Sequence, residues 1–285
     1  MARSLLFAAS MAALSGAACA ASPHVALSVR ENPDMKTLVT HQASMSNGLG
    51  DWRLVFSNRR GHGKTPRTFA FGLSNGVQWG FTGLVQTFAL SVNGIDASRL
   101  QLGARSIREF AADGLRGVEL ILNFDGAPVR LRFWMAEHSP RLEGEIRCSR
   151  RGIEQVTNMA FRVTAVPSFL DCGKGRATRF SGYRRAVRTS SRTIASQADR
   201  KVPMLASERW FAMTDEDFDG SGSDRGAGPC AVMLEEPCYG DIAISGRWTT
   251  ELHFRPDPAR PFRFSLVEKP GGHVSNDMFV KEISR

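Results

Sequence analysis

Alternation of apolar and polar residues in short segments is the strongest constraint on how this chain folds. Residues 118–124, 129–135 and 142–148 each carry apolar side chains at every second position, with mostly charged side chains between them. Asp125-Gly126 separates the first two segments, and a dipeptide of this kind between apolar runs favours a tight hairpin turn. A period of two predicts strands of an antiparallel sheet with one buried face.

The same signals recur along most of the chain. Residues 97–112 are the best helix candidate, but Gly103 interrupts them and residues 105–110 fit a strand equally well. No linker rich in Pro or Ser divides the 285 residues. We therefore expect an all-β fold, a large antiparallel two-sheet β-sandwich formed as a single domain by residues 21–285. The six Asn-Gly or Asp-Gly dipeptides are Asn47-Gly48, Asn75-Gly76, Asn93-Gly94, Asp113-Gly114, Asp125-Gly126 and Asp219-Gly220.

Residues 1–20 have the character of a secretory signal peptide. Arg3 supplies a positive charge, residues 5–14 are mostly apolar, and an A-x-A cleavage pattern ends at Ala20. This pattern predicts export to the periplasm or beyond. A lipoprotein would begin at Cys19, but Gly16 stands where that signal usually has Leu. No later run of about 20 apolar residues predicts a membrane span.

The mature chain would keep four cysteines, an even number that suits disulfide pairing in an oxidising compartment. Short loops are easy to close, which favours the pairs Cys230–Cys238 and Cys148–Cys172. A zinc site is the competing interpretation. The absence of a CxxC spacing and of a neighbouring His argues against it.

Positive charge is in excess, with 37 Lys and Arg against 28 Asp and Glu and a formal net charge of +9. The basic residues are scattered, and in the densest cluster, residues 176–192, only Phe180 and Tyr183 interleave with arginines. Nucleic-acid binding is therefore not expected. An anionic envelope surface or an acidic glycan is the favoured partner, and a solvated basic loop is the alternative.

An acidic run resembles the opening of an EF-hand calcium loop, because carboxylates alternate and a glycine follows the third of them. Gly226 stands where such a loop needs a bidentate Glu, so we expect weak Ca²⁺ binding at most, and no other cofactor. A solvated acidic turn is the alternative. The candidate ligands are Asp215, Asp217, Asp219 and Asp224.

The outward face of the predicted central strands holds the candidate sugar site. An indole can stack on a sugar ring while arginines and carboxylates hydrogen-bond its hydroxyl groups. A His and a Glu could abstract and return a proton. The alternative is a cross-strand ladder of salt bridges around an ordinary surface Trp. The candidate substrate-binding residues are Arg130, Arg132 and Trp134, and the candidate catalytic residues are His138, Glu143 and Glu145.

Residues 133–146 resemble a central strand pair of the galactose mutarotase-like β-supersandwich. The stretch Ser139-Pro140-Arg141-Leu142-Glu143 is similar to one that leads there into a strand with polar residues on the concave face. The resemblance implies a supersandwich fold. It also implies a sugar-related role, since that superfamily includes epimerases and domains of polysaccharide lyases and glycosidases. The catalytic His and Glu of the epimerases are not carried over to positions in this chain.

Two classes of function follow from these features. The first is a secreted carbohydrate-binding or carbohydrate-active protein, of the epimerase or lyase type if it is an enzyme. The second is a non-enzymatic structural or interaction protein of the cell envelope. The sequence contains neither a G-x-S-x-G nor an H-E-x-x-H motif, which argues against lipase-type and zincin hydrolases.

Overall fold

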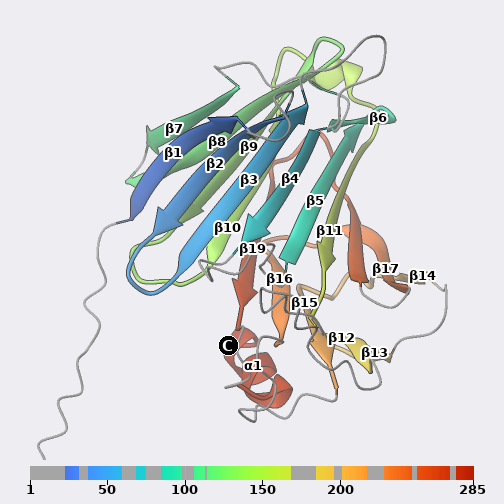
Figure 1. Ribbon diagram of the computed structural model, residues 1–285. Helices are drawn as coiled ribbons and strands as arrows, with labels where there is room; N and C mark the ends of the chain where they lie inside the picture. The colour runs from blue at the N-terminus through green and yellow to red at the C-terminus, as the bar shows by residue number, and fades with distance from the viewer. Residues whose placement is uncertain are drawn as a thin grey trace, which may run out of the picture.

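A computed structural model describes residues 23–31, 38–59, 69–74, 85–97, 100, 106–112, 114–167, 184–195, 201–216, 228–245, 249–269 and 274–285. Within these residues the chain is mostly β-strand, with one short α-helix near the C-terminus (Figure 1). Neighbouring strands pair in antiparallel fashion throughout. The predicted all-β, antiparallel sandwich is therefore confirmed.

One layer of the sandwich is a nine-stranded sheet. Strands that are distant in sequence are neighbours here, because β19 pairs with β10 on one side and with β16 on the other. In spatial order the strands are β13 (Thr193–Ala195), β12 (Arg185–Thr189), β15 (Trp210–Asp215), β16 (Cys230–Leu234), β19 (Phe262–Glu268), β10 (Leu142–Cys148), β9 (Ala127–Met135), β8 (Leu115–Phe124) and β7 (Ile107–Ala112).

Two smaller sheets, in which β4 lies beside β5, form the other layer (Figure 1). The four-stranded sheet contains β1 (His24–Glu31), β2 (Leu38–Ser46), β3 (Asp51–Arg59) and β4 (Phe69–Ser74). The six-stranded sheet contains β14 (Lys201–Pro203), β17 (Tyr239–Ser245), β18 (Thr249–Arg255), β11 (Met159–Ala165), β5 (Val85–Val92) and β6 (Ile95–Asp96). The 3-10 helix η2 (Ile153–Gln155) precedes β11.

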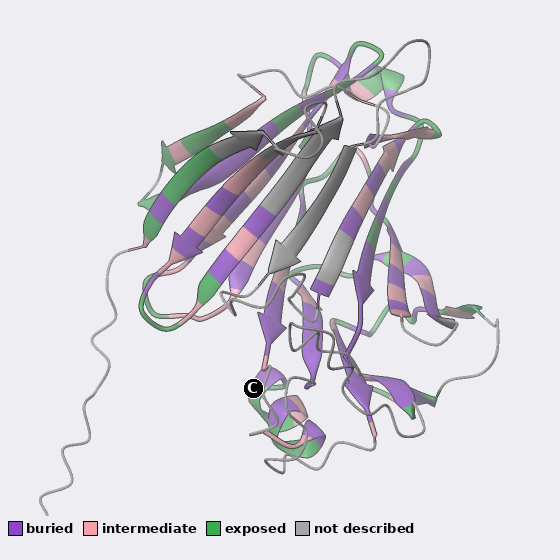
Figure 2. Ribbon diagram, in the orientation of Figure 1, coloured by how far each residue is buried: buried purple, intermediate pink, exposed green. Residues whose placement is uncertain are grey.

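The core lies between the two layers and draws on all three sheets. Phe88 and Phe161 come from one layer and Phe264 from the other; ring centroids are 5.4 Å apart for Phe88–Phe161 and 5.0 Å for Phe161–Phe264. Figure 2 shows the period of two directly, with buried and partly exposed residues alternating along β2. The residues predicted to face inward are buried, namely Val118, Leu120, Leu122, Phe124, Val129, Leu131, Phe133, Met135, Leu142, Ile146 and Cys148.

Two of the predicted hairpin turns have the backbone that their dipeptides favour. Asn93 and Gly94, which join β5 to β6, have φ values of 51° and 77°. Asp125 and Gly126, which join β8 to β9, have φ values of 50° and 89°. Two successive residues with positive φ define the tight turn that matches strand twist. The dipeptides Asn75-Gly76 and Asp219-Gly220 lie outside the described residues.

The helix α1 (Asn276–Ile283) was not expected from the sequence. Its eight residues make only about two turns, too few for a sustained helical period. Ser275 caps it by accepting a hydrogen bond from the backbone N–H of Met278. The other helix candidate, residues 97–112, ends in the strand β7, as the alternative interpretation allowed. None of the helices in the described part of the chain is long and apolar enough to cross a membrane.

The predicted disulfide Cys230–Cys238 is wrong, because both cysteines are free, buried thiols. Cys230 begins β16 and pairs with Glu268 and Met213, while Cys238 lies just before β17 in the other layer. Strand β16 rises about 3.3 Å per residue and carries the chain away from Cys230 before it turns. Cys148 is also a free, buried thiol, and its expected partner Cys172 lies outside the described residues.

Candidate functional site

Charged side chains on the outer face of the nine-stranded sheet, the face turned away from the other layer, form one row across five strands. The register places the members of this charged row directly opposite one another with alternating sign. They are Arg108 on β7, Glu119 on β8, Arg132 on β9, Glu145 on β10 and Arg263 on β19.

Glu119 is the most buried member of the charged row, with 1% of its surface exposed. Its Oε1 accepts hydrogen bonds from Arg108 Nε and Nη2 at 2.9 and 2.5 Å, and its Oε2 accepts one from Arg132 Nε at 2.6 Å. Burial raises the pKa of Glu119, but the hydrogen bonds from the two arginines outweigh burial and hold it below its ordinary value. Glu119 therefore stays ionised as an internal partner for the arginines.

Glu145 is the second buried carboxylate of the charged row. Arg263 Nε donates to its Oε2 at 3.0 Å, and Arg130 Nη2 lies 3.6 Å from its Oε1. Three predicted site residues, Arg130, Arg132 and Glu145, are thus engaged with other protein side chains. This arrangement is the cross-strand ladder that the sequence left open as the alternative.

A cavity of about 290 Å³ opens beside the charged row. Its central residues are the next ones on the same face of each strand, two positions from the charged row. Trp134, Glu143, Ser265 and Met233 lie directly opposite one another on β9, β10, β19 and β16 and form its central part. Glu235, just after β16, adds a carboxylate. The lining includes Trp134, Glu143, Met233, Glu235, Arg263 and Ser265, so an indole, two carboxylates, a guanidinium and a hydroxyl meet in one space.

Glu143 differs from the carboxylates of the charged row because no arginine in the described residues pairs with it within salt-bridge distance. Burial raises the pKa of Glu143 above its ordinary value, and the negative charge of Glu235 raises it further. A hydrogen bond with Ser265 and the charge of Arg141 act in the opposite direction but do not cancel the effect of burial. This carboxyl group is therefore suited to hold a proton inside the cavity.

Trp134 is held in place by packing on its side away from Glu143. Its ring meets Phe110 nearly edge-on, at 82° and a centroid distance of 6.4 Å, and Arg132 lies over the Phe110 ring at 4.8 Å. A Cβ at Gly117, which pairs with Trp134, would lie only 2.8 Å from Trp134 Cβ and 2.9 Å from Phe110 Cε1. Only glycine leaves room for this aromatic pair.

His138 does not line the cavity with Glu143. It is exposed in the turn between β9 and β10, beyond Met135, where β9 ends. Asn47 holds this turn by donating from Nδ2 to the carbonyls of Ala136 and Ser139 at 2.6 and 2.7 Å. Trp52 Nε1 donates to the carbonyl of Pro140 at 2.9 Å. The turn is therefore tied to the loop between β2 and β3.

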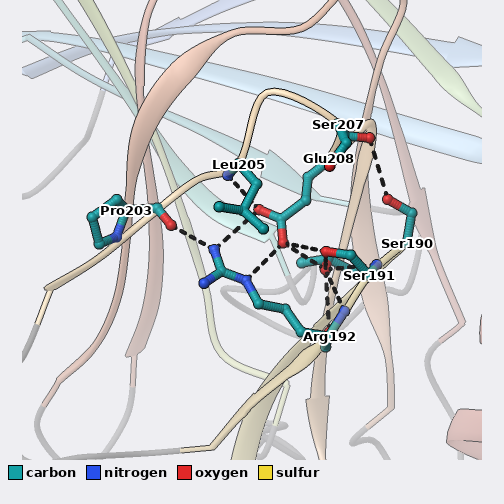
Figure 3. A network of polar contacts seen from close by, with 8 residues as sticks. Ser190, Ser191, Arg192, Pro203, Leu205, Ser207 and Glu208 are labelled. Atoms are coloured by element: carbon teal, nitrogen blue, oxygen red, sulfur yellow. Dashed lines mark hydrogen bonds and ion pairs between the residues drawn. The ribbon is translucent and has the colours of Figure 1, made fainter.

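A second polar cluster, centred on Glu208, is a hydrogen-bond network of the kind that stabilises a fold (Figure 3). Glu208 is 1% exposed and accepts hydrogen bonds from Thr189 Oγ1, Ser191 Oγ, Arg192 Nε and the backbone N–H of Leu205, at 2.8 to 3.0 Å. Burial raises the pKa of this carboxyl, but its donors lower it below the ordinary value. The carboxylate is saturated by the protein, which leaves it no capacity for a ligand.

Arginines of the basic cluster at residues 176–192 make contacts within the fold where the structure describes them. Arg188 Nε donates to Glu216 at 3.0 Å, and its Nη1 donates to Asp277 at the start of α1 at 2.5 Å. Arg185 Nη1 donates to the carbonyl of Thr249 at 3.0 Å. These arginines are internal anchors of the fold. Arg176 and Arg179 lie outside the described residues, so the alternative of a solvated basic loop stays open for them.

The proposed calcium ligands fall mostly outside the described residues. Asp217, Asp219 and Asp224 are among these undescribed positions. Asp215 ends β15 and is 2% exposed, and its carbonyl accepts a hydrogen bond from Asn276 Nδ2 at 2.7 Å. In the part of the chain that is described, no three His, Cys, Asp or Glu side chains are grouped as a metal site. Calcium binding stays a prediction.

The sequence missed half of the cavity because it could not order the strands. The outward positions of β9 and β10 were predicted from alternation. Ser265, Arg263 and Met233 join them only because β19 lies between β10 and β16, more than a hundred residues away in sequence. Alternation in residues 262–266 was a signal that Arg263 and Ser265 face outward, but not that they face the same cavity.

No family model matches the chain, and no curated protein matches it either. Solved structures of the alpha-N-acetylgalactosaminidase NagBb from Bifidobacterium bifidum are similar at low level. The Gal-NHAc-DNJ complex is 13% identical with a TM-score of 0.48, covering 84% of this chain and 38% of that one. The quadruple mutant is 14% identical with a TM-score of 0.45, covering 87% and 37%. This chain thus spans less than two fifths of the length of those structures.

Proposed function

We propose that this chain is a carbohydrate-binding protein that holds a sugar ring against Trp134 in the cavity between β9, β10, β19 and β16. One observation carries the proposal: a single indole lines a cavity together with carboxylate, guanidinium and hydroxyl groups. The indole face suits the apolar face of a sugar ring, while Arg263 and Ser265 can donate hydrogen bonds to its oxygens. A volume near 290 Å³ lies at the lower end of ligand pockets and suits one ring.

The test is a calorimetric titration of the purified protein with neutral and acidic saccharides. We expect Trp134→Ala to weaken the tightest binding at least tenfold, because the stacking surface is lost. Ile121→Ala is the matched control, since Ile121 is an apolar residue on the same outer face, 38% exposed, outside the cavity. Failure to bind any saccharide, or equal weakening by both variants, would contradict the proposal.

A second candidate function is acid–base chemistry on the bound sugar, of the epimerase, lyase or glycosidase kind. It is favoured by one observation, that two carboxylates in different environments line the same cavity. Glu143 is half-buried with a raised pKa, while Glu235 is 59% exposed and paired with Arg263. Two carboxyl groups in such different surroundings are the usual means of dividing acid and base roles.

Glu143→Gln separates the two candidate functions. An amide keeps the shape and the hydrogen bond to Ser265 but carries no transferable proton. If the cavity is catalytic, the variant should bind the saccharide as before and lose at least a hundredfold in turnover. Glu109→Gln is the control, because Glu109 is an exposed carboxylate on β7 that does not line the cavity. Absence of turnover on every saccharide that the wild-type protein binds would leave binding as the sole function.

Export is the other part of the proposal, with residues 1–20 removed and residues 21–285 folding as one domain. It is supported by the positive start, the apolar run and the A-x-A pattern that ends at Ala20. Amino-terminal sequencing of protein from the envelope fraction should begin at Ala21. A chain that begins at Met1, or a lipid-modified Cys19, would contradict this assignment.

A further inference from the structure

A second and larger cavity, of about 450 Å³, lies next to the one that contains Trp134. It is formed where the loop before β17 meets the loop between β18 and β19, and these loops contribute Pro237, Pro256 and Pro261. Proline fixes φ, so these walls lose little freedom when a ligand binds. The second cavity therefore has the semi-rigid walls expected of a preformed site.

The two cavities share a boundary made of side chains. Glu235 and Arg263 line both of them. Arg263 Nη1 lies 3.3 Å from each carboxylate oxygen of Glu235, and Arg263 Nε is fixed by Glu145 at 3.0 Å. A long ligand can therefore pass from one cavity to the other over an ion pair that offers both a donor and an acceptor.

Tyr239 gives the second cavity an aromatic surface of its own. With 77% of its surface exposed, it is the most exposed large hydrophobic side chain in the described part of the chain. It begins β17 opposite Arg255, whose Nη2 donates to Asp241 at 2.6 Å. An exposed aromatic ring at the edge of a cavity costs solvation and is typical of a binding surface. Each cavity thus has one accessible aromatic side chain, Trp134 or Tyr239, above a buried phenylalanine of β19, Phe264 or Phe262.

The charges around the second cavity balance, which bears on the kind of ligand. Its lining has three carboxylates and three guanidinium groups, namely Glu235, Glu236, Asp257, Arg255, Arg260 and Arg263. Balanced charges can hydrogen-bond hydroxyl groups in both directions but do not create the strong positive potential that would select an anion. This argues against the acidic glycan that the overall charge of +9 suggested.

We infer that the two cavities form one groove for a neutral oligosaccharide of at least two rings, with one ring on Trp134 and another on Tyr239. This inference rests on the proposed function and extends it from a single sugar to a chain. The glycosidic bond between the two rings would cross the Glu235–Arg263 pair.

Calorimetry with saccharides of increasing length tests this inference. The probes are neutral series of one to six units built from glucose, galactose, mannose or N-acetylglucosamine, and a galacturonate series of equal lengths. We expect the affinity for at least one neutral series to rise tenfold or more between one unit and two or three units. Tyr239→Ala should remove that gain and leave binding of the single sugar unchanged. Tyr239→Phe should retain the gain.

The controls separate this inference from the proposed function. Met278→Ala, which alters an exposed apolar side chain on α1 outside both cavities, should bind like the wild type. If single sugars bind through Trp134 but length or Tyr239→Ala has no effect, the groove is wrong and the proposed function stands. Preference for the galacturonate series would contradict the inference that the ligand is a neutral oligosaccharide. If no saccharide binds, both the groove and the proposed function fail.

Discussion

The two halves of the outer face of the nine-stranded sheet are covered in different ways, one by ion pairs and the other by a helix. Over β7 to β10 the face carries the charged row, in which Glu119 and Glu145 are buried beneath arginines. Over β15, β16 and the end of β19 it carries small apolar residues that α1 covers. Ala212, Ala231 and Val267 pack there against Phe279 and Ile283 of the helix.

The difference shows where a site can form on such a sheet. Each half is closed, one by ion pairs and the other by a helix. The cavity lies between the two halves. Met233 marks its border with the helix-covered half, because it lines the cavity and also packs against the cluster under α1. Glu143 and Ser265 lie in this gap, where no described arginine forms a salt bridge with Glu143 and neither residue belongs to the cluster under α1.

The largest expected effect comes from opening the helix-covered half. Phe279 is fully buried, and Phe279→Ala should lower the free energy of unfolding by about 3–5 kcal/mol, since it leaves a cavity over Ala212 and Ala231. Chemical denaturation measures this change. Met278→Ala, with a side chain 63% exposed on the same helix, should change stability by less than about 0.5 kcal/mol. A loss below about 1 kcal/mol for Phe279→Ala would mean that α1 adds little to this half.

The charged half should be less costly to break. Glu119→Gln leaves Arg108 and Arg132 without their carboxylate, but Arg108 is 61% exposed and can turn to solvent. We expect a loss of about 1–3 kcal/mol, measured in the same denaturation experiment. Glu109→Gln is the control, because its pair with Arg116 at 3.9 Å is exposed and should contribute less than about 0.5 kcal/mol. Equal losses for the two variants would show that burial of Glu119 is unimportant.

The strands of both halves could be predicted from sequence, and so could the salt-bridge ladder as an alternative, but the helix that covers the other half could not. Alternation is local, and the side of each strand that faces the core follows from it, as the buried Leu131 and Phe133 confirm. The order of the strands depends on contacts between distant segments, such as β10 with β19. Helix α1 is too short to show a period. The expected disulfide failed because closeness in sequence does not bring together residues separated by an extended strand.

Thiol labelling compares the local opening of the two halves. Cys148 lies in β10 beneath the charged half and is 5% exposed, while Cys230 lies in β16 beneath the helix-covered half and is fully buried. Burial raises the pKa of both thiols, so the folded protein should react slowly. We expect Cys148 to label severalfold faster than Cys230. Mass spectrometry of peptides from the labelled protein measures the two rates. Phe279→Ala should accelerate Cys230 more than Cys148, and equal acceleration would contradict independent opening of the halves.

The smallest expected effect distinguishes a carboxylate of the charged row from the carboxylate of the cavity through pH. The pKa of Glu119 is lowered in the folded protein, so its contribution to stability is present above the unfolded pKa near 4.5 and is lost as the pH falls through the folded value. The pKa of Glu143 is raised, so the sign reverses: its ionisation opposes folding once the pH exceeds the unfolded value.

Glu143→Gln should therefore raise Tm slightly at neutral pH, and the gain should fade as the pH falls below about 4.5. Glu119→Gln should lower Tm at neutral pH, and its deficit should shrink in acid. Melting curves of both variants and the wild type between pH 3 and pH 8 measure the two trends. A loss of stability for Glu143→Gln at neutral pH would mean that its carboxylate is paired and that the cavity is a continuation of the ladder.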